Sequence, residues 1–262
     1  MALLEAKGIT KIFGGLVAVD NMQLTIQQGQ VCSIIGPNGA GKTTFFNTLT
    51  GIYKPEHGQI IFKDHDMVGR RPDQITSMGI SRTFQNIRLF GSLTVTENVL
   101  IGMHTHLHQK PWGVLFHTKG FLTEENESHE KAQRLLNFVG LKGMGNELAN
   151  NLPYGGQRKV EIARALASDP DILLLDEPTA GMNPAETSEA ITLFRRARDE
   201  LGTTILLIEH DMNVIMEISE HITVMDYGKK IAEGTPKDIR TNPQVIEAYL
   251  GRGAAAEMNQ GD

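Results

Sequence analysis

One octapeptide restricts what this chain can fold into more than any other feature of its sequence. Residues 36–43 read Gly-Pro-Asn-Gly-Ala-Gly-Lys-Thr, a complete match to the pattern G-x-x-x-x-G-K-[ST]. The glycines allow successive backbone N–H groups to turn toward one anion, and a helix that follows would point its positive dipole end at the same group. The pattern therefore predicts a phosphate-binding loop between a buried strand and a helix.

The flanking sequence supplies that context. The apolar run at residues 30–35 predicts a buried strand, and residues 42–49, followed by Gly51, predict the helix. Further apolar strands are expected at residues 171–176 and 203–208, with an amphipathic helix between them. Continuous apolar strands that alternate with such helices predict an α/β protein, a P-loop nucleotide-hydrolase core built on a parallel sheet.

Two parts of the chain depart from this pattern. Within residues 3–9 and 18–26 apolar and polar side chains partly alternate, as in half-exposed antiparallel strands, and residues 59–62 are a candidate additional strand. The long stretch up to residue 167 has few strand signals, so we expect a helical subdomain at about residues 85–167, inserted in the core. We expect one domain over residues 1–253 and a flexible tail over residues 254–262.

Composition excludes several classes of protein. The formal net charge of −6 disfavours a nucleic-acid-binding protein, which would carry a basic patch. No stretch approaches the roughly 20 apolar residues that span a bilayer, and the N-terminus lacks the features of a secretory signal. The single cysteine, Cys32, lies in a largely apolar stretch with Val31 and Ile34 and is expected to be a small core residue. These features indicate a cytoplasmic, enzyme-like domain.

Three polar residues stand directly at the ends of predicted core strands. Asp176 and Glu177 end the strand at residues 171–176. An acid beside a phosphate loop can hold Mg²⁺ directly or through water, and its neighbour can act as general base for the attacking water. His210 follows the strand at residues 203–208, where a strand-end side chain points into the ligand crevice of a parallel sheet. We therefore predict Asp176 as a metal ligand, Glu177 as the base and His210 as a contact of the γ-phosphate.

Together with the stretch Leu-Pro-Tyr-Gly-Gly-Gln-Arg at residues 152–158, these motifs resemble those of the ATP-binding-cassette (ABC) ATPases, over residues 3–251. The resemblance implies ATP and Mg²⁺ as ligands. It implies that Phe13 stacks on adenine and that Gln85 connects Mg²⁺ and the attacking water to the helical subdomain and the membrane subunit. Thr43 and Gln85 join Asp176 as the expected metal ligands. The expected nucleotide contacts are Phe13, Gly36, Asn38, Gly39, Ala40, Gly41, Lys42, Thr43, Thr44, Tyr154, Gly155 and Gly156.

The signature of this chain departs from the L-S-G-G-Q of the family. In an ungapped match Pro153 takes the serine position, Tyr154 and Gly155 take the two glycine positions, and Gly156 takes the glutamine position. The serine hydroxyl reaches the γ-phosphate across a dimer in the family, and proline lacks that group. Proline suits the first turn of a helix, whose remaining N–H groups and dipole still face an anion.

Several longer segments resemble one subfamily, the ATPases of branched-chain amino acid importers, and in particular the longer of their two ATPases. They are residues 79–90, the Gly-Met-Asn-Pro stretch at 181–184 and the ending at 243–251. The resemblance implies an ATP-hydrolysing subunit that energises import of branched-chain amino acids. Its implied partners are a second ABC ATPase subunit, two transmembrane permeases and, indirectly, an external solute-binding protein. No nucleic acid is expected, and the implied location is peripheral, on the cytoplasmic face of the inner (plasma) membrane.

Other interpretations stay open at this point. A cassette of the same subgroup that serves urea import or lipopolysaccharide export would differ mainly in its partners. A soluble ABC protein that works on ribosomes or DNA is disfavoured by the acidic charge, and a P-loop kinase or GTPase would not explain the signature together with His210. The histidines His104, His106, His108 and His117 favour a solvated loop over a metal site, because no cysteine or carboxylate at ligand spacing completes a set.

Overall fold

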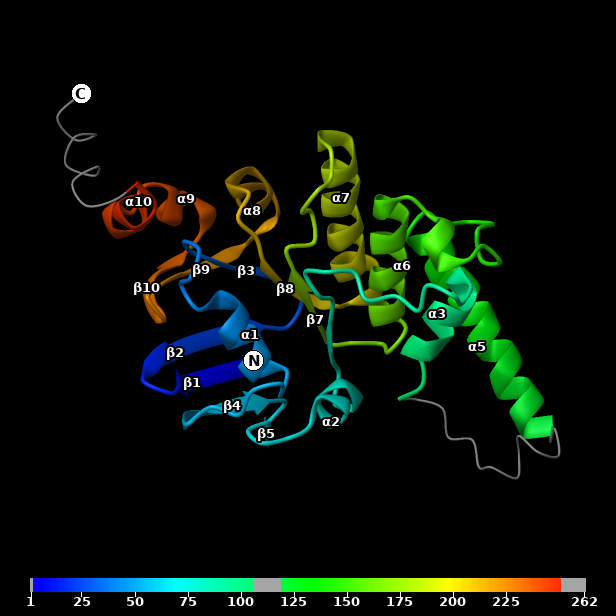
Figure 1. Ribbon diagram of the computed structural model, residues 1–262, viewed down its shortest axis with the longest axis horizontal. Coiled ribbons are helices and arrows are strands. Elements are labelled where there is room, and N and C mark those ends of the chain that lie inside the picture. The colour runs from blue at the N-terminus through cyan, green and yellow to red at the C-terminus, as the bar shows by residue number, and fades with distance from the viewer. Residues whose placement is uncertain (1, 106–118, 251–262) are drawn as a thin grey trace. The chain divides into compact units, whose positions relative to one another are not determined.

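The computed structural model describes residues 2–105 and 119–250 (Figure 1). Their contacts divide the chain into a first unit, formed by residues up to 75 and from 174 onward, and a second unit, residues 76–173. The second unit contains the range expected for a helical subdomain, 85–167, whose exact limits stay a prediction. His106, His108, His117 and the expected tail at 254–262 lie outside the described residues.

A four-stranded sheet begins the first unit. Strand β1 (Ala2–Phe13) pairs in antiparallel orientation with β2 (Leu16–Gln27) on one side and with β4 (His57–Phe62) on the other. The short strand β5 (His65–Asp66) completes the order β2-β1-β4-β5. The alternating sequence pattern is therefore explained by strands with one buried and one more exposed face, and the predicted antiparallel subdomain is confirmed.

The central sheet of the first unit is built around β3 (Val31–Ile35). It lies parallel to β8 (Thr204–Ile208) on one side and to β9 (His221–Asp226) on the other. Strand β7 (Ile172–Asp176) follows beyond β8, and β10 (Lys229–Gly234) pairs in antiparallel orientation with β9. All residues of β3, β7 and β8 are buried, which is why these strands are largely apolar in the sequence and show no alternation.

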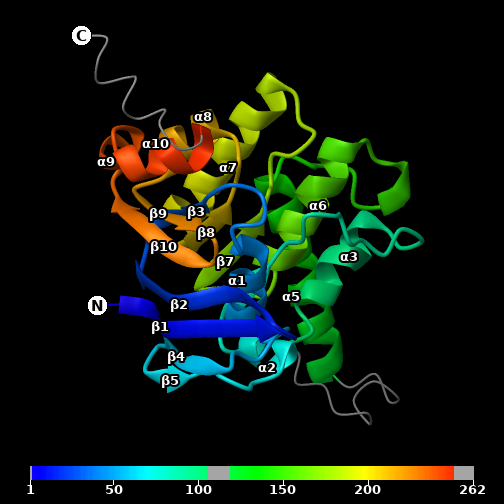
Figure 2. The same cartoon turned by 60° about the vertical axis from the view of Figure 1, so that its left-hand side comes forward.

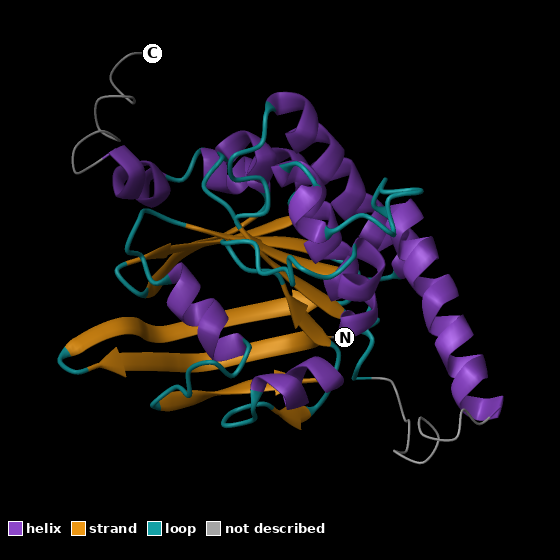
Figure 3. Ribbon diagram, turned by 45° about the vertical axis from the view of Figure 1, so that its right-hand side comes forward, coloured by secondary structure: helices purple, strands orange, loops and turns teal. Residues whose placement is uncertain are grey.

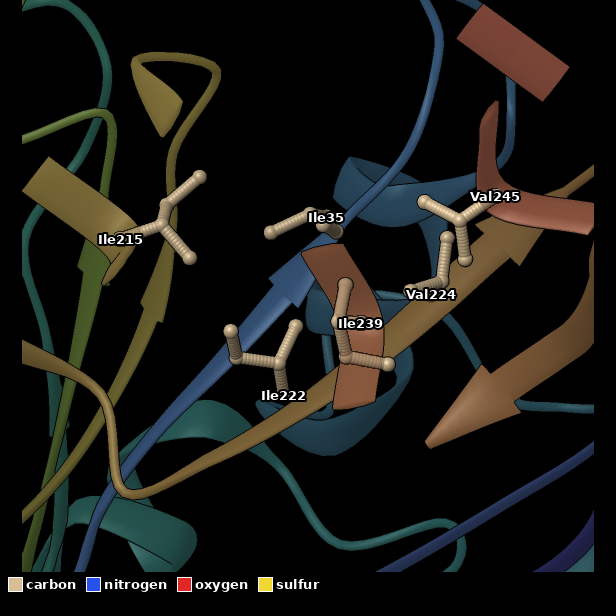
Figure 4. Close-up of a cluster of buried hydrophobic side chains, with 6 residues drawn as sticks. All are labelled: Ile35, Ile215, Ile222, Val224, Ile239 and Val245. Carbon is tan, nitrogen blue, oxygen red and sulfur yellow. The ribbon is translucent and has the colours of Figure 1, made fainter. Parts of the chain in front are cut away.

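Helices cover this sheet. Helix α1 (Lys42–Leu49) lies between the antiparallel sheet and β3 (Figures 1 and 3). The other helices of the first unit are α7 (Pro184–Leu201), α8 (Met212–Ile218), α9 (Pro236–Arg240) and α10 (Pro243–Leu250), while the short α2 (Pro72–Ser77) stands where the two units join in sequence. A cluster of buried side chains from β3, β9 and the last three helices holds the C-terminal segment on the sheet (Figure 4). Its members are Ile35, Ile215, Ile222, Val224, Ile239 and Val245.

The second unit is mainly helical. Its helices α3 (Val95–Gly102), α5 (Lys119–Phe138) and α6 (Tyr154–Leu166) pack against one another (Figure 2). Gly102 allows a close approach here, because a Cβ at this position would collide with the Arg164 carbonyl of α6. A 3₁₀ turn (Ala149–Asn151) precedes α6, and the short strand β6 (Ile80–Arg82) runs beside the start of β7. Within residues 2–105 and 119–250, no helix has both the length and the apolar character needed to cross a bilayer.

Candidate active site

The phosphate loop between β3 and α1 is enclosed by backbone from other strands. Gly36 has a φ of 151°, and a Cβ there would collide with the Met225 carbonyl of β9. Gly41 has a φ of 96°, and its Cβ would collide with the Ala18 carbonyl of β2. Both glycines are therefore required by close packing as well as by their left-handed backbone. The backbone N–H groups of a loop of this kind can turn toward one anion, such as a phosphate group.

Lys42 folds back over this loop. Its side chain is buried, and its Nζ donates to the carbonyls of Gly36 at 2.6 Å and Pro37 at 2.9 Å. Burial lowers the pKa of Lys42, and the negative charges of Glu177 and Asp176 oppose that shift. An ammonium group held at the rim of a glycine loop can exchange its carbonyl partners for phosphate oxygens. Asn38, Gly39 and Thr43 are exposed and Thr44 is half-buried.

Asp176 and Glu177 stand at the end of β7, as expected. Asp176 is 2% exposed and is the last residue of the strand. Glu177 has a φ of 48°, in a region that side-chain-bearing residues rarely adopt and that costs about 1–2 kcal/mol per residue. Its N–H donates to the Ile208 carbonyl at 2.9 Å, which joins the ends of β7 and β8. A strained backbone held in this way is typical of a residue with a functional role.

His210 follows β8 and lies near the same carboxylate. Its Nδ1 is 3.9 Å from Glu177 Oε2, and its side chain is largely exposed. The neighbouring Glu209 is buried and accepts hydrogen bonds from Thr179 N at 2.9 Å, from Thr179 Oγ1 at 2.5 Å and from His210 N at 3.1 Å. Glu209 therefore connects the loops that follow β7 and β8. No role for it was predicted, although a carboxylate between an apolar strand and a histidine was a usable signal.

The aromatic side chain expected to stack on adenine is accessible. Phe13 ends β1, and 40% of its surface is exposed. The Tyr53 ring contacts it edge-on, with the ring centroids 5.1 Å apart, and the Lys11 Nζ lies 5.1 Å from its centroid. A base can stack on an exposed ring of this kind, but this role of Phe13 stays a prediction.

The C-terminal helix also reaches the phosphate loop, which sequence reasoning did not anticipate. The hydroxyl of Tyr249 in α10 is hydrogen-bonded to the backbone of Gly36, and burial raises the pKa of Tyr249 while this bond opposes the rise. A cavity of about 860 Å³ lies on this side of the loop. Its lining comes from the loop, the β9–β10 turn and α10, and includes Asn38, Tyr227, Lys230 and Glu247.

The remaining predicted residues belong to the second unit. Tyr154, Gly155 and Gly156 form the first turn of α6, and Pro153 is its N-cap, without a side-chain hydrogen bond to the helix. Pro153 thus precedes the first turn in which it was expected. Gln85 is exposed in the loop after β6. In the described part of the chain no three His, Cys, Asp or Glu side chains are grouped to hold a metal ion, and the metal roles of Thr43, Gln85 and Asp176 stay predictions.

A family model described as "ABC transporter" matches residues 19–180, and one described as "Branched-chain amino acid ATP-binding cassette transporter" matches residues 229–255. The chain is also similar to the high-affinity branched-chain amino acid transport ATP-binding protein LivG of Escherichia coli (strain K12). The two are 47% identical over 249 residues, which covers 95% of this chain and 98% of LivG. The chain belongs to the ABC transporter family. Within that family, the relatives that it resembles are branched-chain amino acid transport ATP-binding proteins, in agreement with the prediction from the sequence.

Solved structures of ABC cassettes share its fold. A nucleotide-free ATP-binding cassette from an ABC transporter superposes with a TM-score of 0.83 at 34% identity, and the match covers 96% of this cassette and 100% of the other. A dimeric ATP-binding cassette in a post-hydrolysis state, bound to ADP and phosphate, has a TM-score of 0.75 at 28% identity, with 89% and 98% covered. These matches confirm the predicted fold, a P-loop core with an antiparallel β subdomain and a helical insertion.

Proposed function

We propose that this cassette binds ATP with Mg²⁺, hydrolyses it, and thereby drives import of branched-chain amino acids. One observation carries the proposal. At the glycine loop of the first unit, Lys42 lies within the influence of the Asp176 and Glu177 charges, and His210 lies beside Glu177. The similarity of the chain to branched-chain amino acid transport ATP-binding proteins supports the transport assignment.

The loop residues fit a nucleoside triphosphate with Mg²⁺. The backbone N–H groups of the loop and Lys42 bind the β- and γ-phosphates, and Gly36 and Gly41 allow the loop to pack closely against the carbonyls of Met225 and Ala18. The Thr43 hydroxyl and the Asp176 carboxylate are oxygen donors of the kind that Mg²⁺ prefers. Bound Mg²⁺ would neutralise phosphate charge and stabilise the charge that develops on transfer. The ring of Phe13 stacks on the adenine.

Glu177 then acts as general base. Its carboxylate takes a proton from a water molecule, whose oxygen attacks the γ-phosphorus while the bond to the oxygen that bridges the β- and γ-phosphates breaks. The products are ADP and phosphate. His210 touches the γ-phosphate and Gln85 orients the attacking water. The first turn of α6, at Tyr154, Gly155 and Gly156, would cap the ATP of a second cassette with its N–H groups.

The proposed assembly pairs this chain with a second ABC ATPase subunit and two permeases, on the cytoplasmic face of the membrane, and it receives its solute from an external binding protein. The dimeric cassette bound to ADP and phosphate supports the pairing. We assign the permease contact to residues 85–90. The half-exposed ring of Phe90 and the exposed Arg88 line a cavity of about 660 Å³, which suits a protruding permease segment.

Reconstitution tests the proposal. The cassette would be co-expressed with the permeases, purified with them, and placed in liposomes together with the binding protein. We expect leucine, isoleucine and valine to stimulate ATP hydrolysis and to accumulate in the compartment that faces away from the binding protein. The Glu177→Gln transporter serves as the matched control without hydrolysis. Uptake of urea in place of leucine, or turnover of ATP that depends on ribosomes or DNA, would contradict the proposal.

A further inference from the structure

The loop that carries Gln85 is held at both ends by buried polar side chains of the second unit. At its far end the buried Asn98 of α3 binds both backbone groups of one residue, Phe90. Its Oδ1 accepts from Phe90 N at 2.9 Å, and its Nδ2 donates to Phe90 O at 3.0 Å and to Thr94 O at 2.9 Å. A single amide side chain thus takes the place of a strand partner for Phe90.

At the near end an ion pair within α6 binds the backbone of Phe84 in the same manner. Arg158 is 0% and Glu161 is 1% exposed, and Arg158 Nη1 lies 2.7 Å from Glu161 Oε2. The same Nη1 donates to the Phe84 carbonyl at 2.6 Å, and Phe84 N donates to Glu161 Oε1 at 3.3 Å. Both backbone groups of the residue before Gln85 are therefore bound by one ion pair.

The Phe84 ring is held as well. The guanidinium carbon of Arg88 lies 4.4 Å from its centroid, and that of Arg82 lies 5.2 Å from it. Cations at such distances are attracted by the negative face of an aromatic ring. Phe84 is therefore an anchored residue, whereas its neighbour Gln85 is exposed.

Stability alone is a poor explanation for this arrangement. Two charges lose their hydration on burial, and replacement of a buried ion pair by apolar residues of similar volume is often neutral or stabilising. An ion pair differs from an apolar contact in its directionality, because it binds a particular N–H and a particular carbonyl. The pair therefore determines where the backbone of Phe84 lies relative to α6.

We propose that Arg158 and Glu161, with Asn98 at the other end of the loop, are positioning residues that make Gln85 and the signature turn of α6 move as one body. This inference rests on the proposed function, in which Gln85 orients the attacking water. Arg158 lies about one turn after Tyr154, where α6 begins. The Arg158–Glu161 ion pair, called the clamp below, therefore transmits motion of the N-terminal end of α6, which carries the signature, directly to Phe84. Gln85 then reaches its catalytic position only together with the signature turn.

The double variant Arg158→Met/Glu161→Leu tests the clamp, because it removes both charges and keeps the volume. In the reconstituted transporter we expect kcat for ATP to fall roughly tenfold or more, since a small misplacement of a positioned group has effects of that order. The KM for ATP should stay within about twofold, because the phosphate loop is intact. Hydrogen exchange in the full chain should be faster at the Phe84 amide than in the wild type.

The exposed pair Arg134–Glu130 on α5, in which Arg134 Nη1 lies 3.7 Å from Glu130 Oε2, supplies the matched control. Arg134→Met/Glu130→Leu should leave kcat, KM and the hydrogen exchange of the Phe84 amide unchanged.

If the clamp variant does not fold, Arg158→Lys replaces it, because lysine keeps the charge and lacks the planar guanidinium group. Its kcat should fall with KM unchanged. Wild-type kcat and wild-type Phe84 exchange in either folded clamp variant would overturn the proposal. Absence of ATP hydrolysis in the wild type would refute the proposed function instead, and the exchange rates would still report on the clamp.

Discussion

The Nδ1 atom of His210 lies 3.9 Å from the Oε2 atom of Glu177, although the two residues follow different strands. The separation exceeds a direct hydrogen bond and suits two groups that share a water molecule or a phosphate oxygen. The left-handed backbone of Glu177 and the buried bonds of Glu209 hold the two loops that carry this pair. The proposed general base and the proposed γ-phosphate contact are thus held near each other by the fold of the chain.

The substitution Glu177→Gln is expected to separate binding from hydrolysis. Glutamine keeps the shape of the side chain but does not accept the proton of the attacking water. Because general base catalysis contributes about 10²–10⁴-fold, we expect kcat to fall by that order while ATP binding persists. Turnover of radiolabelled ATP and binding of a fluorescent ATP analogue measure the two quantities. Near-normal turnover in this variant would exclude Glu177 as the base.

Lys42→Ala should weaken nucleotide binding without unfolding the protein. The ammonium is predicted to exchange the carbonyls of Gly36 and Pro37 for phosphate oxygens, and a charge-assisted hydrogen bond contributes about 1.5–3 kcal/mol. The dissociation constant for ATP should therefore rise roughly ten- to hundredfold, as measured by isothermal titration calorimetry. Lys237→Ala, at an exposed position of α9, is the control. Equal affinities in the two variants would refute the role of Lys42.

Glu209→Ala should destabilise the first unit. The substitution leaves Thr179 N, Thr179 Oγ1 and His210 N without their acceptor, and buried groups that lose a charged partner cost about 1–3 kcal/mol. Urea unfolding would measure the change in the free energy of unfolding. Glu217→Ala removes an exposed carboxylate and should change it by less than about 0.5 kcal/mol. A similarly small change for Glu209→Ala would show that the two loops do not depend on this carboxylate.

Cys32 should make stability depend on pH in the alkaline range. Burial, with a smaller contribution from the charge of Glu220, raises the pKa of Cys32 from 9.0 to about 12. The unfolded thiol therefore ionises above pH 9 while the folded one stays protonated, so the stability present below pH 9 is lost progressively up to about pH 12. The loss is at most about 1.4 kcal/mol per pH unit.

Urea unfolding of wild type and Cys32→Ala across this pH range isolates the contribution of the thiol, because all other titrating groups are shared. The difference between the two free energies of unfolding should shrink or change sign as the pH rises. A difference that is independent of pH would contradict the buried, protonated thiol. The native thiol should also react slowly with alkylating reagents near neutral pH.

The core strands and the phosphate loop were predictable because their signals are local. The apolar runs that became β3, β7 and β8 are buried along their whole length, and the glycine pattern fits only a strand–loop–helix junction. The strand β6 was not anticipated, because Ile80–Arg82 is too short to show a period. The apolar face of the amphipathic helix α7 does not extend to its end, because its last residue, Leu201, is 46% exposed next to Gly202.

The contacts that were missed join residues far apart in sequence. Glu209 acts through Thr179, and the Arg158–Glu161 pair acts through Phe84, so neither role is visible in a local pattern. Asn183, in the Gly-Met-Asn-Pro stretch, caps α7, where its side chain accepts from Ala185 N and Glu186 N.

The close packing of Gly36 against Met225 and of Gly41 against Ala18 has a consequence for protein engineering. The octapeptide supplies only part of its own binding site, because the walls that shape it come from β2 and β9. A fragment that ends before β9, or a transplant of residues 36–43 onto another strand and helix, would reproduce the motif without its enclosure. The octapeptide therefore identifies proteins of this kind in a sequence search, but it should not function when it is transferred alone. The unit that can be moved between proteins is the whole cassette.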